Sequence, residues 1–171
     1  MNTVAVGEGP RHPVIVETVR CPDEQATAAL AQALASRPGL RQALITLQGD
    51  LGAGKTTLVR HLLRALGIQG RIRSPTYALV EPYDPPGLPI WHFDFYRFTN
   101  PDEWEDAGLR ELFARPGLKL VEWPQQAGPR LPRPDLACVL HVATDGSRQI
   151  ELSALSPLGR TLLPEAGRTG Q

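Results

Sequence analysis

The segment at residues 49–57 places the strongest constraint on what this chain can fold into. It reads Gly-Asp-Leu-Gly-Ala-Gly-Lys-Thr-Thr and matches the pattern G-x-x-x-x-G-K-[ST]. The apolar run 43–47 before it predicts a buried strand, and residues 58–67 after it carry apolar side chains at helical spacing and end on a glycine. Strand, glycine-rich loop and helix in this order are the context of a phosphate-binding loop, or P-loop. The segment therefore predicts a site for nucleotide phosphates.

The residue types in this loop suit that chemistry. Glycines let consecutive backbone N–H groups point into one concave nest, and the helix start adds the positive end of its dipole. Lys55 is expected to reach the β- and γ-phosphates, and the Thr56 hydroxyl to bind Mg²⁺. Of the 18 Lys and Arg residues, only Lys55 and Lys119 are lysines. This scarcity favours a specific role for the compact ammonium group of Lys55.

Composition limits the class of protein. A chain of 171 residues with 42% hydrophobic residues can build one domain with a substantial core. Its net charge of zero gives no general attraction to nucleic acid or to an acidic membrane. Cys21 and Cys138 lie far apart without metal-ligand spacing, which favours two reduced, buried thiols. Because no signal peptide or membrane-spanning run is recognisable, we expect a cytoplasmic protein without a membrane partner.

The pattern along the chain predicts a single α/β domain at residues 14–156, between a disordered leader at 1–13 and a partly disordered tail at 157–171. Two hairpins are expected, one around the turn at 84–87 and one around Asp145-Gly146, so the sheet has an antiparallel section. Strands are predicted at 14–20, 43–47, 78–83, 90–96, 118–123, 136–142 and 149–155, and helical segments at 22–36, 58–67 and 99–114.

A P-loop that supports hydrolysis needs carboxylates nearby to hold Mg²⁺ and to position water. Glu122 ends the apolar run 118–121, so we favour it as a metal ligand over an ordinary solvent-facing acid. Asp94 is the second candidate, because it shares one face of its strand with His92 and Tyr96. His92 by itself is interpreted as structural. Thr76 is a weaker candidate for a switch residue that responds to phosphate.

Several nucleotide-binding classes are disfavoured. No N-K-x-D motif follows, which argues against a GTPase, and the chain has no room for the helical lid domain of an AAA-type machine. A small-molecule P-loop kinase stays open as an alternative. Its lid arginines would come from Arg71 and Arg73, or from Arg130 and Arg133, although solvated loop arginines are the simpler interpretation.

Five motifs in order resemble the TsaE family, the bacterial ATPase subunit of tRNA threonylcarbamoyladenosine (t6A) biosynthesis. The likeness covers roughly residues 16–155, and the last three motifs make it more specific than the P-loop alone. The motifs are Pro-Asp-Glu-Gln-Ala-Thr at 22–27, the P-loop at 49–57, Ser-Pro-Thr-Tyr at 74–77, His-Phe-Asp-Phe-Tyr-Arg at 92–97 and Val-Glu-Trp-Pro-Gln at 121–125.

The resemblance implies a three-layer α/β/α P-loop NTPase fold with a mixed parallel and antiparallel sheet. It implies an ATP hydrolase that is weak alone and acts with TsaB and TsaD on adenosine 37 of tRNAs reading ANN codons, so tRNA is met through the complex. Thr56 and Glu122 would bind Mg²⁺, Lys55 and Asp94 would be catalytic, and Trp123 would report nucleotide binding. The ATP-binding residues would be Glu24, Asp50, Leu51, Gly52, Ala53, Gly54, Lys55, Thr56 and Thr57.

We therefore expect a Mg²⁺-dependent ATPase that powers a partner's catalytic cycle. Two alternatives remain at this point. One is the small-molecule kinase, which would transfer the phosphate to a metabolite instead of water. The other is a non-catalytic interaction module, in which the acidic, Trp-bearing stretch at 102–113 would be the docking surface.

Overall fold

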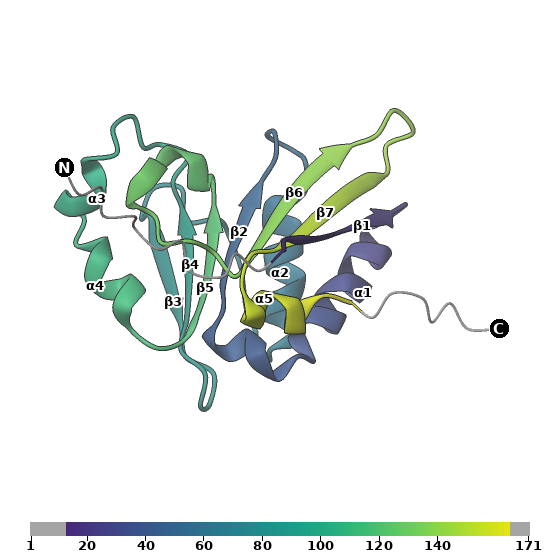
Figure 1. The fold of residues 1–171 in the computed structure, drawn as a ribbon, viewed down its shortest axis with the longest axis horizontal. Helices are drawn as coiled ribbons and strands as arrows, with labels where there is room; N and C mark the ends of the chain where they lie inside the picture. Colours follow the sequence, from purple (N-terminus) through teal and green to yellow (C-terminus); the bar gives the residue numbers. More distant parts are fainter. Residues whose placement is uncertain (1–12, 165–171) are drawn as a thin grey trace, which may run out of the picture.

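The computed structural model describes residues 13–164, which form one seven-stranded sheet with helices packed around it (Figure 1). The predicted leader therefore lies almost entirely outside the described residues, as does the end of the chain. In spatial order, the strands are β1 (Ile15–Cys21), β7 (Arg148–Ala154), β6 (Leu136–Val142), β2 (Leu44–Gln48), β5 (Leu118–Glu122), β4 (Ile90–Asp94) and β3 (Val80–Tyr83).

The sheet is mixed, as the resemblance implied. The central strand β2 runs parallel to β5 and β6, and β4 runs parallel to β5. Antiparallel pairs complete both edges: β3 with β4 on one side, β6 with β7 and then β7 with β1 on the other. The two hairpins expected from the turn signals are both present, so the prediction of a mixed α/β sheet is confirmed.

Two longer helices cover one part of the sheet, α1 (Glu24–Ala35) and α2 (Lys55–Ala65), and they lie side by side (Figure 1). Asp23 caps α1: its carboxylate accepts a hydrogen bond from the Ala26 N–H at 2.9 Å. Asp23 is thus the N-cap residue that precedes the helix. The predicted helical segment at 22–36 had included it. The acidic stretch forms two short helices, α3 (Glu103–Asp106) and α4 (Leu109–Ala114), separated at Gly108.

The central strands are buried on both faces, which explains their continuous apolar sequences. Alternate residues of β5 point to opposite sides of the sheet, so Leu118 and Leu120 join the core under α1 and α2, whereas Val121 joins a second core. That second core contains Phe93 from β4 and Trp104 from α3. Helices on both sides of one sheet therefore give the layered architecture that the resemblance implied.

The packed part of the chain continues past residue 156, where the sequence analysis ended the domain. Helix α5 (Pro157–Leu162) begins at Ser156, whose hydroxyl accepts a hydrogen bond from the Gly159 N–H at 3.0 Å. The same hydroxyl donates to the Asp135 carboxylate at 2.7 Å, and Leu162 is fully buried in the main core. The apolar run at 158–163 is thus part of the domain, because its leucines complete the core between β7 and the turn at Pro38–Gln42.

Both thiols are free and buried, as predicted. Cys138 lies on β6, where burial raises the pKa of its thiol to about 12. Cys21 ends β1, and there too burial is the main cause that raises the thiol pKa. Among residues 13–164, no helix has the length and apolar character needed to cross a bilayer.

The packing of α5 predicts that replacing Gly159 destabilises the domain. A Cβ atom at this position would lie 1.9 Å from the Asp135 carbonyl oxygen, which is backbone and cannot move aside. We expect Gly159→Ala to lower the free energy of unfolding by about 1–3 kcal/mol, measured by urea denaturation. Thr161→Ala, on the exposed side of the same helix, is the control and should change it by less than about 0.5 kcal/mol. Equal stability of wild type and Gly159→Ala would show that α5 is not packed in this way.

Candidate active site

The P-loop and both candidate carboxylates meet at the carboxyl ends of three neighbouring parallel strands. The loop follows β2, Asp94 ends β4 and Glu122 ends β5. The register sets Glu122 beside Leu47 of β2 on one side and beside Asp94 on the other. In open α/β sheets this edge is where ligands bind. Parallel pairing therefore brings together side chains that are 28 or more positions apart in the sequence.

The loop has the backbone shape of an anion-binding nest. Gly52 and Gly54 adopt left-handed conformations, with φ angles of 80° and 105°, which other residues adopt only with strain. Gly54 directly precedes α2, so the first helical N–H groups open towards the loop. This geometry explains why the glycines of the pattern stand at these positions.

Lys55 is buried at the start of α2, with 5% of its surface exposed. Its ammonium group donates to the carbonyl oxygens of Gly49 and, at 3.0 Å, of Asp50. Burial lowers the pKa of this ammonium, and the carboxylates of Glu122, Asp94 and Asp50 oppose that shift. The site thus holds a buried cation whose present hydrogen-bond partners are backbone carbonyl oxygens, with three carboxylates nearby.

Thr56 and Glu122 are in direct contact. The Thr56 hydroxyl donates to one Glu122 oxygen at 2.8 Å, while His92 Nε2 lies 2.6 Å from the other and the Ser74 hydroxyl 3.3 Å from it. An ionised carboxylate only accepts, so His92 Nε2 is the donor in this contact when Glu122 is charged. Within the described part of the chain, His92 Nδ1 is the one buried side-chain polar atom without a hydrogen-bond partner. His92 is therefore part of the site as well as of the core, because its contact from the neighbouring strand β4 holds the Glu122 carboxylate in place.

Asp94 faces this network and not the solvent. Only 3% of its surface is exposed. One of its oxygens accepts from the Ser74 hydroxyl and, at 3.2 Å, from the Thr76 hydroxyl, and the other accepts from the Tyr96 N–H at 2.9 Å. The single Ser74 hydroxyl, which donates to Asp94, also lies 3.3 Å from Glu122, so the segment around 74–76 lies against both acids.

The donor set fits a hard divalent cation such as Mg²⁺. Thr56, Ser74, Asp94 and Glu122 present only oxygen atoms, which Mg²⁺ prefers. Within residues 13–164, no group of three or more His, Cys, Asp or Glu side chains is arranged to hold a metal ion. Mg²⁺ commonly takes just one or two carboxylates and completes its shell with waters and phosphate oxygens, so this set is sufficient for it.

Trp123 covers the Lys55 side of the site. The residue has a left-handed backbone, with φ at 58°, which turns the chain sharply after Glu122. Its ring centroid is 4.3 Å from Lys55 Nζ and 5.0 Å from the Tyr96 ring. A phosphate that draws Lys55 away from its carbonyl contacts would change the surroundings of this indole.

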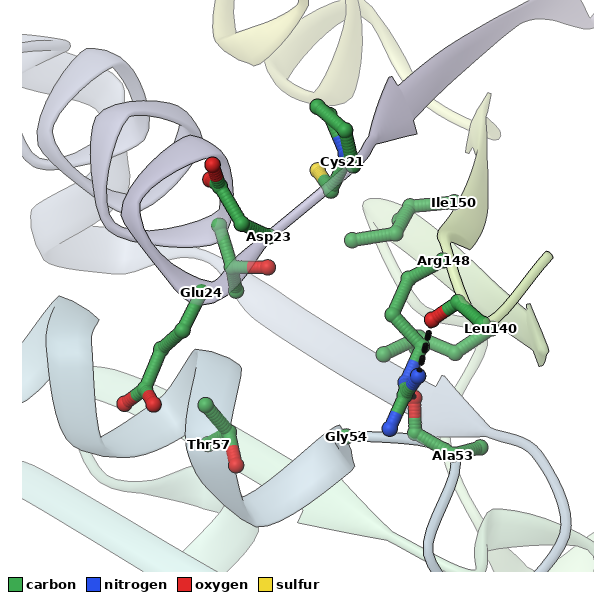
Figure 2. Close-up of a pocket in the computed structure, with 12 residues that line it drawn as sticks. Cys21, Asp23, Glu24, Ala53, Gly54, Thr57, Leu140, Arg148 and Ile150 are labelled. Atoms are coloured by element: carbon green, nitrogen blue, oxygen red, sulfur yellow. Dashed lines mark hydrogen bonds between the residues drawn. The ribbon is translucent and has the colours of Figure 1, made fainter. Parts of the chain in front are cut away.

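A cavity of about 270 Å³ adjoins the site formed by the P-loop and the two carboxylates. Figure 2 shows Glu24 and Thr57, at the starts of α1 and α2, on one side, and Leu140, Arg148 and Ile150 of the β6–β7 hairpin on the other. The Glu24 carboxylate is 2.9 Å from His61 Nε2. The structure thus places Glu24 at this pocket, and Asp94 and Thr76 at the phosphate site.

Sequence reasoning missed three polar residues of the site: Ser74, His92 and Arg148. The signal for Ser74 was its place in the Ser-Pro-Thr-Tyr motif, and for His92 its position two residues before Asp94 on the same strand face. Arg148 gave no signal, since it belongs to no motif and reaches the loop only through tertiary packing.

The acidic stretch at 102–113 is only partly buried. Trp104 lies in the second core, so the exposed surface of this stretch consists mainly of charged residues. Arg130, considered above as a solvated or lid arginine, is ion-paired with Asp102 at 2.5 Å and Glu105 at 3.0 Å. These ion pairs connect α3 to the loop after β5, and they occupy the guanidinium group of Arg130.

Comparisons with known proteins agree with this geometry. A family model described as threonylcarbamoyl adenosine biosynthesis protein TsaE matches residues 21–150. The tRNA threonylcarbamoyladenosine biosynthesis protein TsaE of Haemophilus influenzae is 42% identical over 120 residues, covering 70% of this chain and 75% of that protein. The protein of the same name from Bacillus subtilis is 37% identical over 147 residues, covering 86% and 90%.

A solved structure shares the fold. The crystal structure of Bacillus subtilis YdiB superposes with a TM-score of 0.73 at 31% identity, covering 88% of this chain and 93% of that one. The matched region of the family model spans the P-loop, both carboxylates and Arg148. With the family model covering most of the sequence and relatives sharing more than a third of their aligned residues, the chain belongs to the TsaE family.

Proposed function

We propose that this protein is a Mg²⁺-dependent ATPase that supports threonylcarbamoylation of adenosine 37 in tRNAs reading ANN codons. The observation that carries the proposal is the contact network in which Lys55 and Thr56 of the P-loop helix meet Glu122 and Asp94. Membership of a family named for t6A biosynthesis supports the assignment to this pathway.

The roles of the residues follow from their positions. Backbone N–H groups of the loop bind the phosphates, and Lys55 exchanges the carbonyls of Gly49 and Asp50 for phosphate oxygens. Thr56 and Glu122 would hold Mg²⁺, which when bound supplies positive charge to the β- and γ-phosphates. The Glu24 side of the adjoining pocket would receive the adenosine.

Asp94 is proposed to position the attacking water. Hydrogen bonds from Ser74, Thr76 and the Tyr96 N–H hold its carboxylate in place, so an oxygen can accept a proton from water in line with the γ-phosphate. The water oxygen bonds to the γ-phosphorus, the bond to the bridging oxygen breaks, and ADP and phosphate are released. A change in the charge or position of Asp94 during the reaction would be felt by Ser74 and Thr76, because both hydroxyls donate to its carboxylate.

The partners proposed are TsaB and TsaD homologues, with tRNA met through their complex. The exposed ring of Tyr96 lines the phosphate site, and the exposed Tyr77 directly follows Thr76 of that site, which suits a partner that covers it. Two free thiols fit a reducing compartment and support a cytoplasmic location. The test is ATP turnover with and without TsaB, TsaD and tRNA: we expect weak hydrolysis alone and several-fold stimulation by the complete set.

The small-molecule kinase is distinguished in the same assay by following the γ-phosphate of labelled ATP. Release as inorganic phosphate supports an ATPase, whereas transfer to a metabolite would replace that proposal with the kinase. The ion pairs of Arg130 with Asp102 and Glu105 reduce its availability as a lid residue.

Removing the Lys55 ammonium should abolish function without unfolding the protein. We expect Lys55→Ala to lower ATP turnover by about 10²–10³-fold, because it removes the ammonium group that we propose binds the phosphates as negative charge develops on them. Arg71→Ala is a control that removes an exposed cation elsewhere. Turnover and tRNA modification are measured alongside circular dichroism, and normal activity of Lys55→Ala would refute the site.

A Mg²⁺ titration should distinguish the roles of the two carboxylates. Glu122→Gln keeps the shape of the side chain but removes a charged metal ligand, so the Mg²⁺ concentration for half-maximal nucleotide binding should rise by about 10-fold or more. Asp94→Asn should instead lower turnover while leaving that concentration near the wild-type value. An unchanged titration for Glu122→Gln would move the metal role to Asp94.

A further inference from the structure

Arg148, the first residue of β7, is bonded to carbonyl oxygens at the end of the P-loop. Its Nε donates to the Ala53 carbonyl at 3.0 Å, and Nη2 lies 3.3 Å from the Gly52 carbonyl. Nη1 donates to the Gly146 carbonyl of its own hairpin at 2.7 Å. Figure 2 shows the guanidinium group between the hairpin and the end of the loop. The side chain therefore links the β6–β7 hairpin to a loop about a hundred residues earlier.

Two cations thus hold the loop from opposite ends. Lys55 binds the carbonyls of Gly49 and Asp50 at the start of the loop, and Arg148 binds those of Gly52 and Ala53 at its end. Lys55 must release its carbonyls to reach a phosphate. The bonds from Arg148 run to the Gly52 and Ala53 carbonyls, a different pair from the two that Lys55 releases, so they can persist when Lys55 moves.

These bonds bear on the direction of the loop N–H groups. In a trans peptide, the carbonyl of one residue and the N–H of the next point in opposite directions. Fixing the Ala53 carbonyl towards Arg148 therefore fixes the Gly54 N–H away from it. Gly54 has a left-handed backbone at the helix start, where conformational freedom is greatest and an external anchor has most effect.

Arg148 also lies at the boundary of two cavities, since it lines both the adjoining cavity of about 270 Å³ and the phosphate site. Its guanidinium has more N–H donors than these carbonyls occupy. Among the described residues that line these cavities, Gly54, Thr57 and Arg148 line both, and Arg148 comes from the β6–β7 hairpin. A change in the position of the hairpin would thus be passed to the loop through Arg148, where the two cavities meet.

We propose that Arg148 is a positioning residue: by binding the Gly52 and Ala53 carbonyls, it holds the P-loop in its phosphate-binding shape before nucleotide arrives. This inference rests on the proposed nucleotide site, but it concerns the empty loop as well. The planar guanidinium bonds both neighbouring carbonyls and the hairpin at once, which a single ammonium group cannot do in the same geometry.

The test compares Arg148→Met and Arg148→Lys with wild type. Met retains the apolar stem, so the fold, checked by circular dichroism and thermal unfolding, should persist. Hydrogen exchange of a peptide spanning 49–54 in nucleotide-free protein should accelerate about 10-fold or more in both variants, and the Kd for ADP should rise by a similar factor. Arg20→Ala is the matched control: Arg20 pairs with Asp145 in the turn of the same hairpin at 2.7 Å without contacting the loop, and should change neither readout.

The outcomes are distinct. Wild-type loop exchange and ADP affinity in Arg148→Met would overturn the proposal. Recovery of both by Arg148→Lys would overturn it as well, because charge alone would then suffice. If wild-type protein failed to bind ADP, the nucleotide site itself would be refuted, and faster loop exchange in the variants would still establish the anchoring role.

Discussion

The parallel pairing of β5 with β2 and β4 is the constraint on which the rest of the site depends. This register sets Glu122 next to both Leu47 and Asp94 at one edge of the sheet. The loop after β2 then brings Thr56 within 2.8 Å of Glu122. Burial of β5 on both faces stabilises the register, because a shift by one residue would exchange Leu120 and Val121 between two different cores.

The site is a connected set of hydrogen bonds in which each acid has several donors. Thr56 and His92 contact Glu122, Thr76 and the Tyr96 N–H donate to Asp94, and the single Ser74 hydroxyl lies within reach of both acids. Buried carboxylates are costly unless they are satisfied in this way. A metal ion or a water molecule could replace these hydroxyl groups as partners of the two carboxylates. The contacts that stabilise the carboxylates without ligand thus also hold them in position for it. The segment 74–76 is shared between both acids and responds to any such exchange.

Several features were readable from local patterns, each for a physical reason. The P-loop glycines are demanded by positive φ angles, the two hairpins by their turn residues, and the buried central strands by apolar runs. Others were not readable. The extension of the domain through α5 depends on a close approach of Gly159 to Asp135, and the burial of Trp104 depends on which face of α3 meets β4. The contact of His92 with Glu122 requires the register of two strands.

The sequence by itself determined the phosphate loop, the mixed α/β class and, through its five motifs, the TsaE family. These depend on residue types at short spacings, where backbone geometry and periodicity act locally. Only the tertiary structure decided that Glu122 and Asp94 lie against the same hydroxyl group, that His92 lies beneath Glu122, and that Arg148 anchors the loop. Those contacts join residues 20 to 96 positions apart, and they exist because the sheet brings three strand ends and a distant hairpin to one place.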